Sequence, residues 1–307
     1  MGYSRWDSND YRSFASTSAA TLSAARSCGM SDSMARKQVF KQTTIKSIFD
    51  PKGVMLRESR DSEVNPNSNA IILGLDVTGS MGIVAEKIAT EGLGKLVDGI
   101  LTRKPVDDPH VMVMAIGDAF CDLAPLQVSQ FEADIRIAEQ LKELWLEGGG
   151  GGNAFESYDI PWYFAGKRTA IDCFEKRGKK GYLFTIGDEP PPPQGLTSQQ
   201  INSIFNGGEE KSYSSEEMLE LAQEKYNVFH IICEQGSHCS YNHSRNNTIA
   251  KWRNLLGKKA ILLSDYDYIS EVIISVMEVN EGADPESVIN SWEKIDAKNA
   301  VRHALGL

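Results

Sequence analysis

Acidic and hydroxyl side chains gather where apolar segments of this 307-residue chain end. Asp76, Thr78 and Ser80 follow one apolar segment at alternate positions, and Asp188 follows another. Carboxylate and hydroxyl oxygens are hard ligands, which suit Mg²⁺ or Mn²⁺ rather than zinc. Because Mg²⁺ usually takes only one or two protein carboxylates, such a site leaves a position for a ligand from outside. These four residues are the predicted metal ligands, and none of them is expected to be catalytic.

The apolar segments predict strands that are buried on both faces, and most are separated by segments with a helical spacing of apolar residues. The predicted strands are 70–75, 111–116, 182–186, 228–233 and 260–263. The segment 124–131 follows its predecessor too closely for a helical crossover, so we expect an antiparallel edge strand. The predicted fold class is α/β: a Rossmann-like, doubly wound, mostly parallel sheet with helices on both faces.

Such sheets bind ligands at the carboxyl ends of their strands, which is where the four predicted ligands lie. This pattern resembles the von Willebrand factor type A (VWA) family over about residues 70–280. The metal-ion-dependent adhesion site (MIDAS) of that family has Asp-x-Ser-x-Ser after the first strand, a Thr in a glycine-containing loop and an Asp after the fourth strand. Asp76, Thr78 and Ser80 match the first element, with Thr in place of the first Ser, and Asp188 matches the last.

The resemblance, to intracellular bacterial or phage members, implies a cytoplasmic, non-catalytic adaptor domain with a Mg²⁺ or Mn²⁺ cofactor. In such a domain the metal takes an Asp or Glu carboxylate from a partner protein, often within an assembly that contains an AAA+ ATPase. One element departs from the family pattern, because the glycine run 148–152 is followed by no Thr. Asn153 and Glu156 stand nearest, and we expect one of them to supply the missing contact, Asn153 through a bridging water.

Other interpretations of the same residues remain open. Thr78 or Ser80 could cap the following helix, which would make the chain a metal-free structural or assembly protein. A phosphoester hydrolase could use the same ion to position water, although Thr78 stands where one phosphatase family has a second acid. Four residues of one loop also have the side-chain types of a zinc site, without the spacing of a common zinc module: Cys233, His238, Cys239 and His243.

The charge balance argues against nucleic acid as a partner. The chain has 32 Lys and Arg against 42 Asp and Glu, whereas binding to phosphates needs a basic surface. No apolar run approaches the length of a membrane helix, and the first residues lack the apolar segment of a secretory signal. Five cysteines, an odd number in a long chain, favour reduced thiols and a cytoplasmic location.

The chain divides by composition into four segments. Residues 1–35, rich in Ser and Ala, are expected to be a mobile tail with one transient helix, and 36–69 a lead-in arm. Residues 70–280 are expected to form the VWA-like domain, with a helix from Pro161 to about Arg177. Residues 281–307 are expected to form an amphipathic helix. This helix begins at Asp284-Pro285, and its apolar stripe consists of Val288, Trp292 and Ile295.

Overall fold

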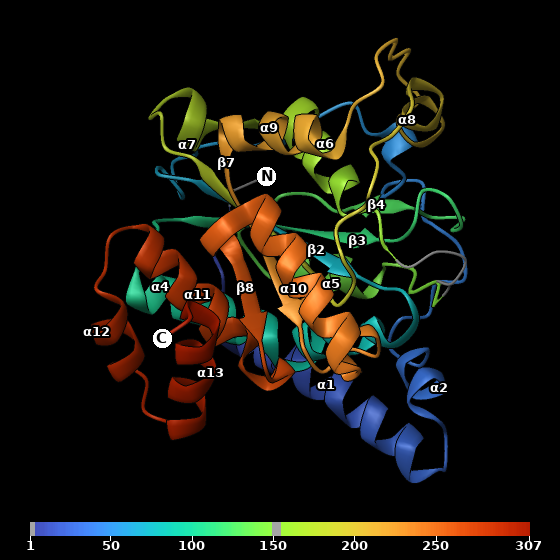
Figure 1. Ribbon diagram of the computed structural model, residues 1–307. Coiled ribbons are helices and arrows are strands. Elements are labelled where there is room, and N and C mark those ends of the chain that lie inside the picture. Colours follow the sequence, from blue (N-terminus) through green and yellow to red (C-terminus); the bar gives the residue numbers. More distant parts are fainter. Residues whose placement is uncertain (1–3, 149–154) are drawn as a thin grey trace.

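A six-stranded sheet forms the centre of the computed structural model, which describes residues 4–148 and 155–307 (Figure 1). The strands lie in the order β4-β3-β2-β6-β7-β8, and every neighbouring pair is parallel except β3 with β4. Their bounds are β2 (Asn69–Asp76), β3 (Pro109–Ile116), β4 (Leu126–Val128), β6 (Gly181–Gly187), β7 (Tyr226–Cys233) and β8 (Ala260–Leu263). The predicted α/β sheet with one antiparallel edge strand is confirmed.

Helices cover both faces of this sheet, which explains why β2, β3 and β6 are buried along their whole length. Ile71, Leu73 and Leu75 pack with one group of helices, and Ala70 and Ile72 with the other. The first group is α3 (Gly82–Lys87), α4 (Leu93–Arg103), α5 (Arg136–Lys142) and α11 (Ile269–Asn280). The second is α6 (Asp159–Lys167), α8 (Ser198–Phe205), α9 (Ser215–Lys225) and α10 (Asn242–Leu256). Within the described ranges, no helix is long and apolar enough to cross a membrane.

The prediction of one helix from Pro161 to about Arg177 is wrong over the second half of that range. Helix α6 ends at Lys167, and Thr169–Ile171 form a strand, β5, before the short helix α7 (Asp172–Glu175). Strand β5 pairs in parallel with β1 (Arg57–Ser59) from the lead-in arm. This pairing partner lies more than a hundred residues away, so local helical spacing could not reveal it.

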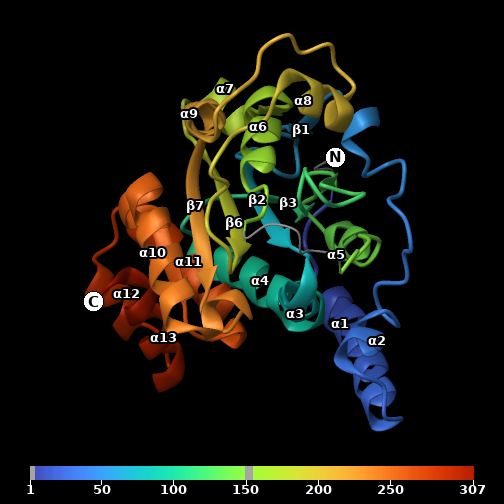
Figure 2. The same ribbon diagram turned by 45° about the vertical axis from the view of Figure 1, so that its right-hand side comes forward.

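The N-terminal segment contains a 20-residue helix, α1 (Ser8–Ser27), where the sequence led us to expect a tail with a transient helix. Figure 2 shows α1 and the short α2 (Asp32–Arg36) beside α3. One face of α1 is buried, through residues spaced three or four apart: Tyr11, Ala15, Ser18, Leu22 and Ala25. Most of these side chains are small, so the stripe has little apolar character in the sequence even though it packs closely.

Buried Glu86 of α3 ties both N-terminal helices to the domain. Its two carboxylate oxygens accept hydrogen bonds from Arg26 Nη2 at 2.8 and 2.9 Å, and one also accepts from Arg36 Nε at 3.1 Å. Further along, a π-helical turn (Ile88–Gly92) joins α3 to α4, and the Tyr11 hydroxyl donates to the Ile88 carbonyl. Helix α1 is therefore anchored to the helix that follows the predicted metal loop.

Replacing Glu86 by Gln is expected to lower the free energy of unfolding by about 1–3 kcal/mol, because a neutral amide cannot satisfy two guanidinium groups. Chemical denaturation measures the loss. Glu286→Gln is the matched control, since Glu286 forms an exposed pair with Arg302 and its loss should leave stability unchanged. Equal effects of the two substitutions would contradict this anchoring role.

The C-terminal segment forms two helices, α12 (Pro285–Asn290) and α13 (Ile295–Leu305), where one was expected. The predicted start is confirmed, since Asp284 caps α12 and Pro285 follows it. Val288 is buried, but Ile295 is 66% exposed and does not belong to the apolar stripe. The helical structure is interrupted between α12 and α13, where Trp292 lies. The indole nitrogen of Trp292 donates to Ser275 Oγ at 2.8 Å.

Candidate metal site

The sheet brings Asp76 and Asp188 together at its carboxyl edge. Asp76 is the last residue of β2, and Asp188 directly follows β6. Because Leu75 is paired with Ile186, Asp76 lies beside the end of β6. The strand order reverses between β2 and β6, since the chain builds the sheet outward from β2 through β3 and then from β6 through β8. Ligands of doubly wound sheets bind at such a switch point.

Asp76 is fully buried and accepts hydrogen bonds from Thr78 and Tyr158 among the described residues. Its Oδ1 accepts from the Thr78 amide at 2.9 Å and from Thr78 Oγ1 at 2.6 Å, while its Oδ2 accepts from the Tyr158 hydroxyl at 2.8 Å. Burial raises the pKa of Asp76 to about 7, and the charge of Asp188 raises it too, against the lowering effect of these hydrogen bonds. The surroundings therefore disfavour an uncompensated charge on Asp76.

Asp188 is 3% exposed and lies under the loop that follows β7. Its Oδ2 accepts from the His238 amide at 2.8 Å, and its carbonyl accepts from Cys239 Sγ at 3.1 Å. A side chain at Gly236 would overlap the carboxylate, so a glycine there lets this loop close over Asp188. Burial raises the pKa of Asp188 as well.

Two glutamates, Glu156 and Glu189, lie close enough to Asp76 to be affected by its charge, and Glu189 was not among the predicted ligands. Glu156 and Glu189 each have a buried Oε2 with no hydrogen-bond partner among the described residues. Burial, with the charges of Asp76 and the neighbouring glutamate, raises the pKa of Glu156 to about 10. Burial together with Asp76 and Asp188 raises that of Glu189 to about 7. The one signal for Glu189 in the sequence is its place directly after Asp188.

Two predicted ligands cannot be placed. Ser80 belongs to the turn Gly79–Met81, but its side chain lies outside the described part of the chain, as does the whole of Asn153. The Thr78 hydroxyl donates to Asp76. Helix α3 is preceded by Met81 and has no side-chain cap among the described residues. The helix-capping alternative therefore finds no support at Thr78.

The donor set fits a hard cation that keeps water. Across residues 4–148 and 155–307, no three His, Cys, Asp or Glu side chains are arranged to hold a metal ion. A cation at this edge would therefore depend on two carboxylates, Asp76 and Asp188, with hydroxyl oxygens and water. Mg²⁺ accepts that combination, whereas a structural zinc site needs four nitrogen or sulfur ligands.

The zinc alternative is wrong for the described loop. Cys233 is buried in β7, and the Cys239 thiol donates to the Asp188 carbonyl. His243 is exposed on α10. The four residues share a stretch of sequence but do not form one cluster.

Tyr158 holds Asp76 in place and was not among the predicted metal ligands. Its ring packs edge-on against His230 at 4.8 Å and Trp252 at 5.5 Å, and Gly187 leaves room for its hydroxyl. Tyr158 is fully buried. Its hydrogen bond to Asp76 depends on contacts between distant segments.

Tyr158→Phe is expected to weaken Mg²⁺ binding about 10- to 100-fold, because hydrogen bonds from outside the ligand shell orient metal ligands. Titration calorimetry measures the affinity. Tyr226→Phe is the matched control, since Tyr226 is also buried and loses a hydroxyl contact, to Thr169 at 2.7 Å, away from the site. Unchanged Mg²⁺ affinity in Tyr158→Phe would show that Tyr158 only fills space.

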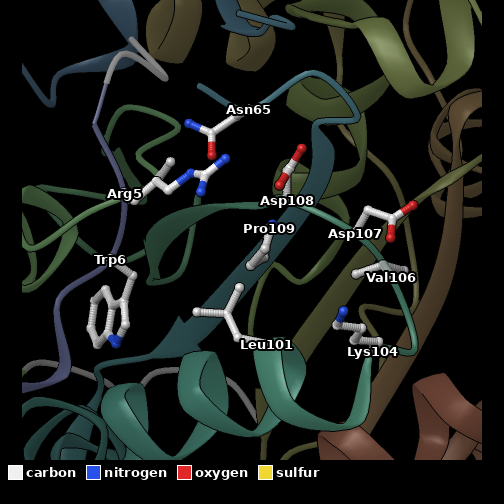
Figure 3. A pocket seen from close by; sticks show the side chains of 10 residues that line it. Arg5, Trp6, Asn65, Leu101, Lys104, Val106, Asp107, Asp108 and Pro109 are labelled. Carbon is white, nitrogen blue, oxygen red and sulfur yellow. The ribbon is translucent and has the colours of Figure 1, made fainter. Parts of the chain in front are cut away.

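A separate pocket of about 280 Å³ lies at the opposite edge of the sheet (Figure 3). It is lined by Pro109, where β3 begins, by Leu101 and Lys104 at the end of α4, and by Arg5 and Trp6 of the N-terminal segment. Cations and carboxylates both line it. The pocket is therefore not part of the predicted metal site.

No protein-family model matches the chain, and no curated protein matches it. Solved structures with a similar fold include the pilus adhesin SpaC from Lactobacillus rhamnosus GG in its open conformation (11% identity, 76% of this chain and 31% of that chain, TM-score 0.43). They also include a von Willebrand factor type A protein from Catenulispora acidiphila (13%, 71% and 44%, TM-score 0.40). A third is proximal thread matrix protein 1 from the mussel byssus (10%, 69% and 47%, TM-score 0.43). The matches cover less than half of each of these chains, and likenesses this distant assign neither a family nor a function.

Proposed function

We propose that this chain binds one Mg²⁺ or Mn²⁺ ion through Asp76, Thr78, Ser80 and Asp188, and that the ion takes a carboxylate from a partner protein. One observation carries the proposal. Asp76 and Asp188 are buried side by side where the strand order reverses, and among the described residues no Lys or Arg forms an ion pair with either. Burying two carboxylates without a cation is costly, and a divalent ion would offset that cost.

The protein ligands leave part of the coordination shell of the ion free for an oxygen of the partner. Two carboxylates and the hydroxyl oxygens fill only part of the coordination shell of Mg²⁺, so water or an outside oxygen completes it. When bound, the ion supplies a positive centre that attracts and orients a carboxylate. Tyr158 and the Thr78 amide hold Asp76 in position, and the His238 amide does the same for Asp188.

Affinity capture tests the proposal. The immobilised protein is expected to retain a partner in Mg²⁺ and to release it in EDTA, and Asp188→Asn should retain none. Ser215→Ala, which removes a buried hydroxyl that donates to Asp159 away from the site, serves as the control variant. A partner that stays bound in EDTA would contradict the proposal. Mg²⁺-dependent turnover of an aryl phosphate that stops in Asp76→Ala would replace it with the phosphoester hydrolase.

A further inference from the structure

We infer that the partner contacts a second patch beside the metal site: a rigid apolar rim formed by Phe120, Leu123 and Phe155. The inference rests on the proposed function and specifies the partner. It is a protein segment that carries a large apolar side chain next to its metal-binding Asp or Glu, with Lys or Arg flanking them.

The rim is exposed although it consists of large apolar side chains. Leu123 is 83% exposed and Phe120 is 39% exposed, while Phe155 is half-buried. The rings of Phe120 and Phe155 meet edge to face with centroids 5.8 Å apart. Grouped apolar side chains on a soluble surface are typical of contact sites, because leaving them in water is unfavourable.

The rim lies against the segment that holds Asp76. The amide of Ala119 donates to Ser157 Oγ at 3.0 Å, and Ser157 Oγ donates to Asp118 Oδ1 at 3.1 Å. Ser157 is next to Tyr158, whose hydroxyl donates to Asp76. Three residues, Ala119, Ser157 and Tyr158, therefore link Phe120 to the predicted ligand Asp76.

Carboxylates hold the loop that carries the rim in one shape. Asp118 Oδ1 accepts from the Phe120 amide at 3.0 Å, and Asp122 Oδ2 accepts from the Asp118 amide at 2.8 Å. Glu147 accepts from the amides of Leu123 at 3.2 Å and Ala124 at 3.0 Å. A loop fixed by its own hydrogen bonds loses little conformational entropy when a partner binds.

Three carboxylates lie in or against the loop of the rim, and they indicate what flanks the apolar side chain of the partner. Asp118 and Asp122 belong to the same loop as Phe120 and Leu123, and Glu147 accepts a hydrogen bond from the Leu123 amide. Asp122 and Glu147 are half-buried, so their negative charge reaches the surface beside the rim. Lys or Arg beside the metal-binding acid would complement them and suppress unsuitable partners.

A displayed library of random peptides provides the test, with the whole protein as target, binding in Mg²⁺ and elution by EDTA. The eluted peptides are expected to share an Asp or Glu, a large apolar residue close to it, and Lys or Arg nearby. Their affinity should fall about tenfold or more for Leu123→Ser and for Phe120→Ser. Ile295→Ser is the matched control, because Ile295 is 66% exposed on α13, outside this edge.

The possible outcomes distinguish a failure of the rim hypothesis from a failure of the metal-site hypothesis. Peptides that need Mg²⁺ and Asp76 but bind Leu123→Ser and Phe120→Ser as tightly as the unmodified protein would overturn the rim and leave the proposed function standing. Eluted peptides without a shared apolar residue would also overturn it. If EDTA elutes no peptide, the rim and the proposed carboxylate binding both fail.

Discussion

Asp76→Ala is expected to abolish the stabilisation of this protein by Mg²⁺. An ion present at about 100 times its dissociation constant stabilises the folded state by about 2.7 kcal/mol, which is readily seen as a rise in melting temperature. Asp76 ends β2 at the switch point and is the one predicted ligand that both Thr78 and Tyr158 orient. Without its carboxylate, Asp188 alone with hydroxyl oxygens should hold Mg²⁺ too weakly to raise the melting temperature.

Thermal melts with and without Mg²⁺ measure this effect. Asp159→Asn is the control, because Asp159 is another fully buried carboxylate that accepts from Ser215 Oγ at 2.9 Å and is not a predicted ligand. It should keep the full response to Mg²⁺. An equal rise in melting temperature for the unmodified protein and Asp76→Ala would place any Mg²⁺ effect elsewhere.

The affinity for Mg²⁺ is expected to increase by about tenfold per pH unit for each bound proton displaced, up to about pH 7, and to level off above it. The reason is that burial raises the pKa of Asp76 to about 7, so the folded protein holds a proton there that the ion must displace. Titration calorimetry between about pH 5.5 and 8 gives the profile. A dissociation constant that does not change with pH would contradict a protonated Asp76 at the ion site.

The raised pKa of Asp76 also determines how the stability of the metal-free protein depends on pH. The folded pKa of Asp76 lies above its value in an unfolded chain, so the folded state binds more protons between about pH 4 and 7. Stability without metal should therefore decrease as pH rises through this window. Asp76→Ala should lose less stability over the same range, which denaturation at several pH values would show.

The sheet and the two aspartates were predictable because both depend on local sequence. Continuous apolar runs indicate strands buried on two faces, and Asp76 and Asp188 come directly after two such runs. The parallel arrangement then brings the ends of these strands to one edge, which requires no knowledge of side-chain contacts.

The features that sequence could not provide all depend on contacts between distant segments. Tyr158 reaches Asp76 across 82 positions, and β5 pairs with β1 across more than a hundred. Helix α1 has a buried face of mainly small residues, whose contribution to stability depends on the surface of the π-helical turn Ile88–Gly92 and of α4 that it covers. The separation of α12 from α13 likewise depends on the contact of Trp292 with Ser275.

A crystal of the protein soaked in Mn²⁺ would show directly whether Asp76 and Asp188 bind a divalent ion, because the anomalous signal of the ion reveals its position. One strong anomalous peak is expected at the carboxyl edge of the sheet, in contact with Asp76, Asp188 and the hydroxyl oxygens of Thr78 and Ser80. The absence of a peak there at saturating Mn²⁺, or a peak bound only by other residues, would contradict this expectation.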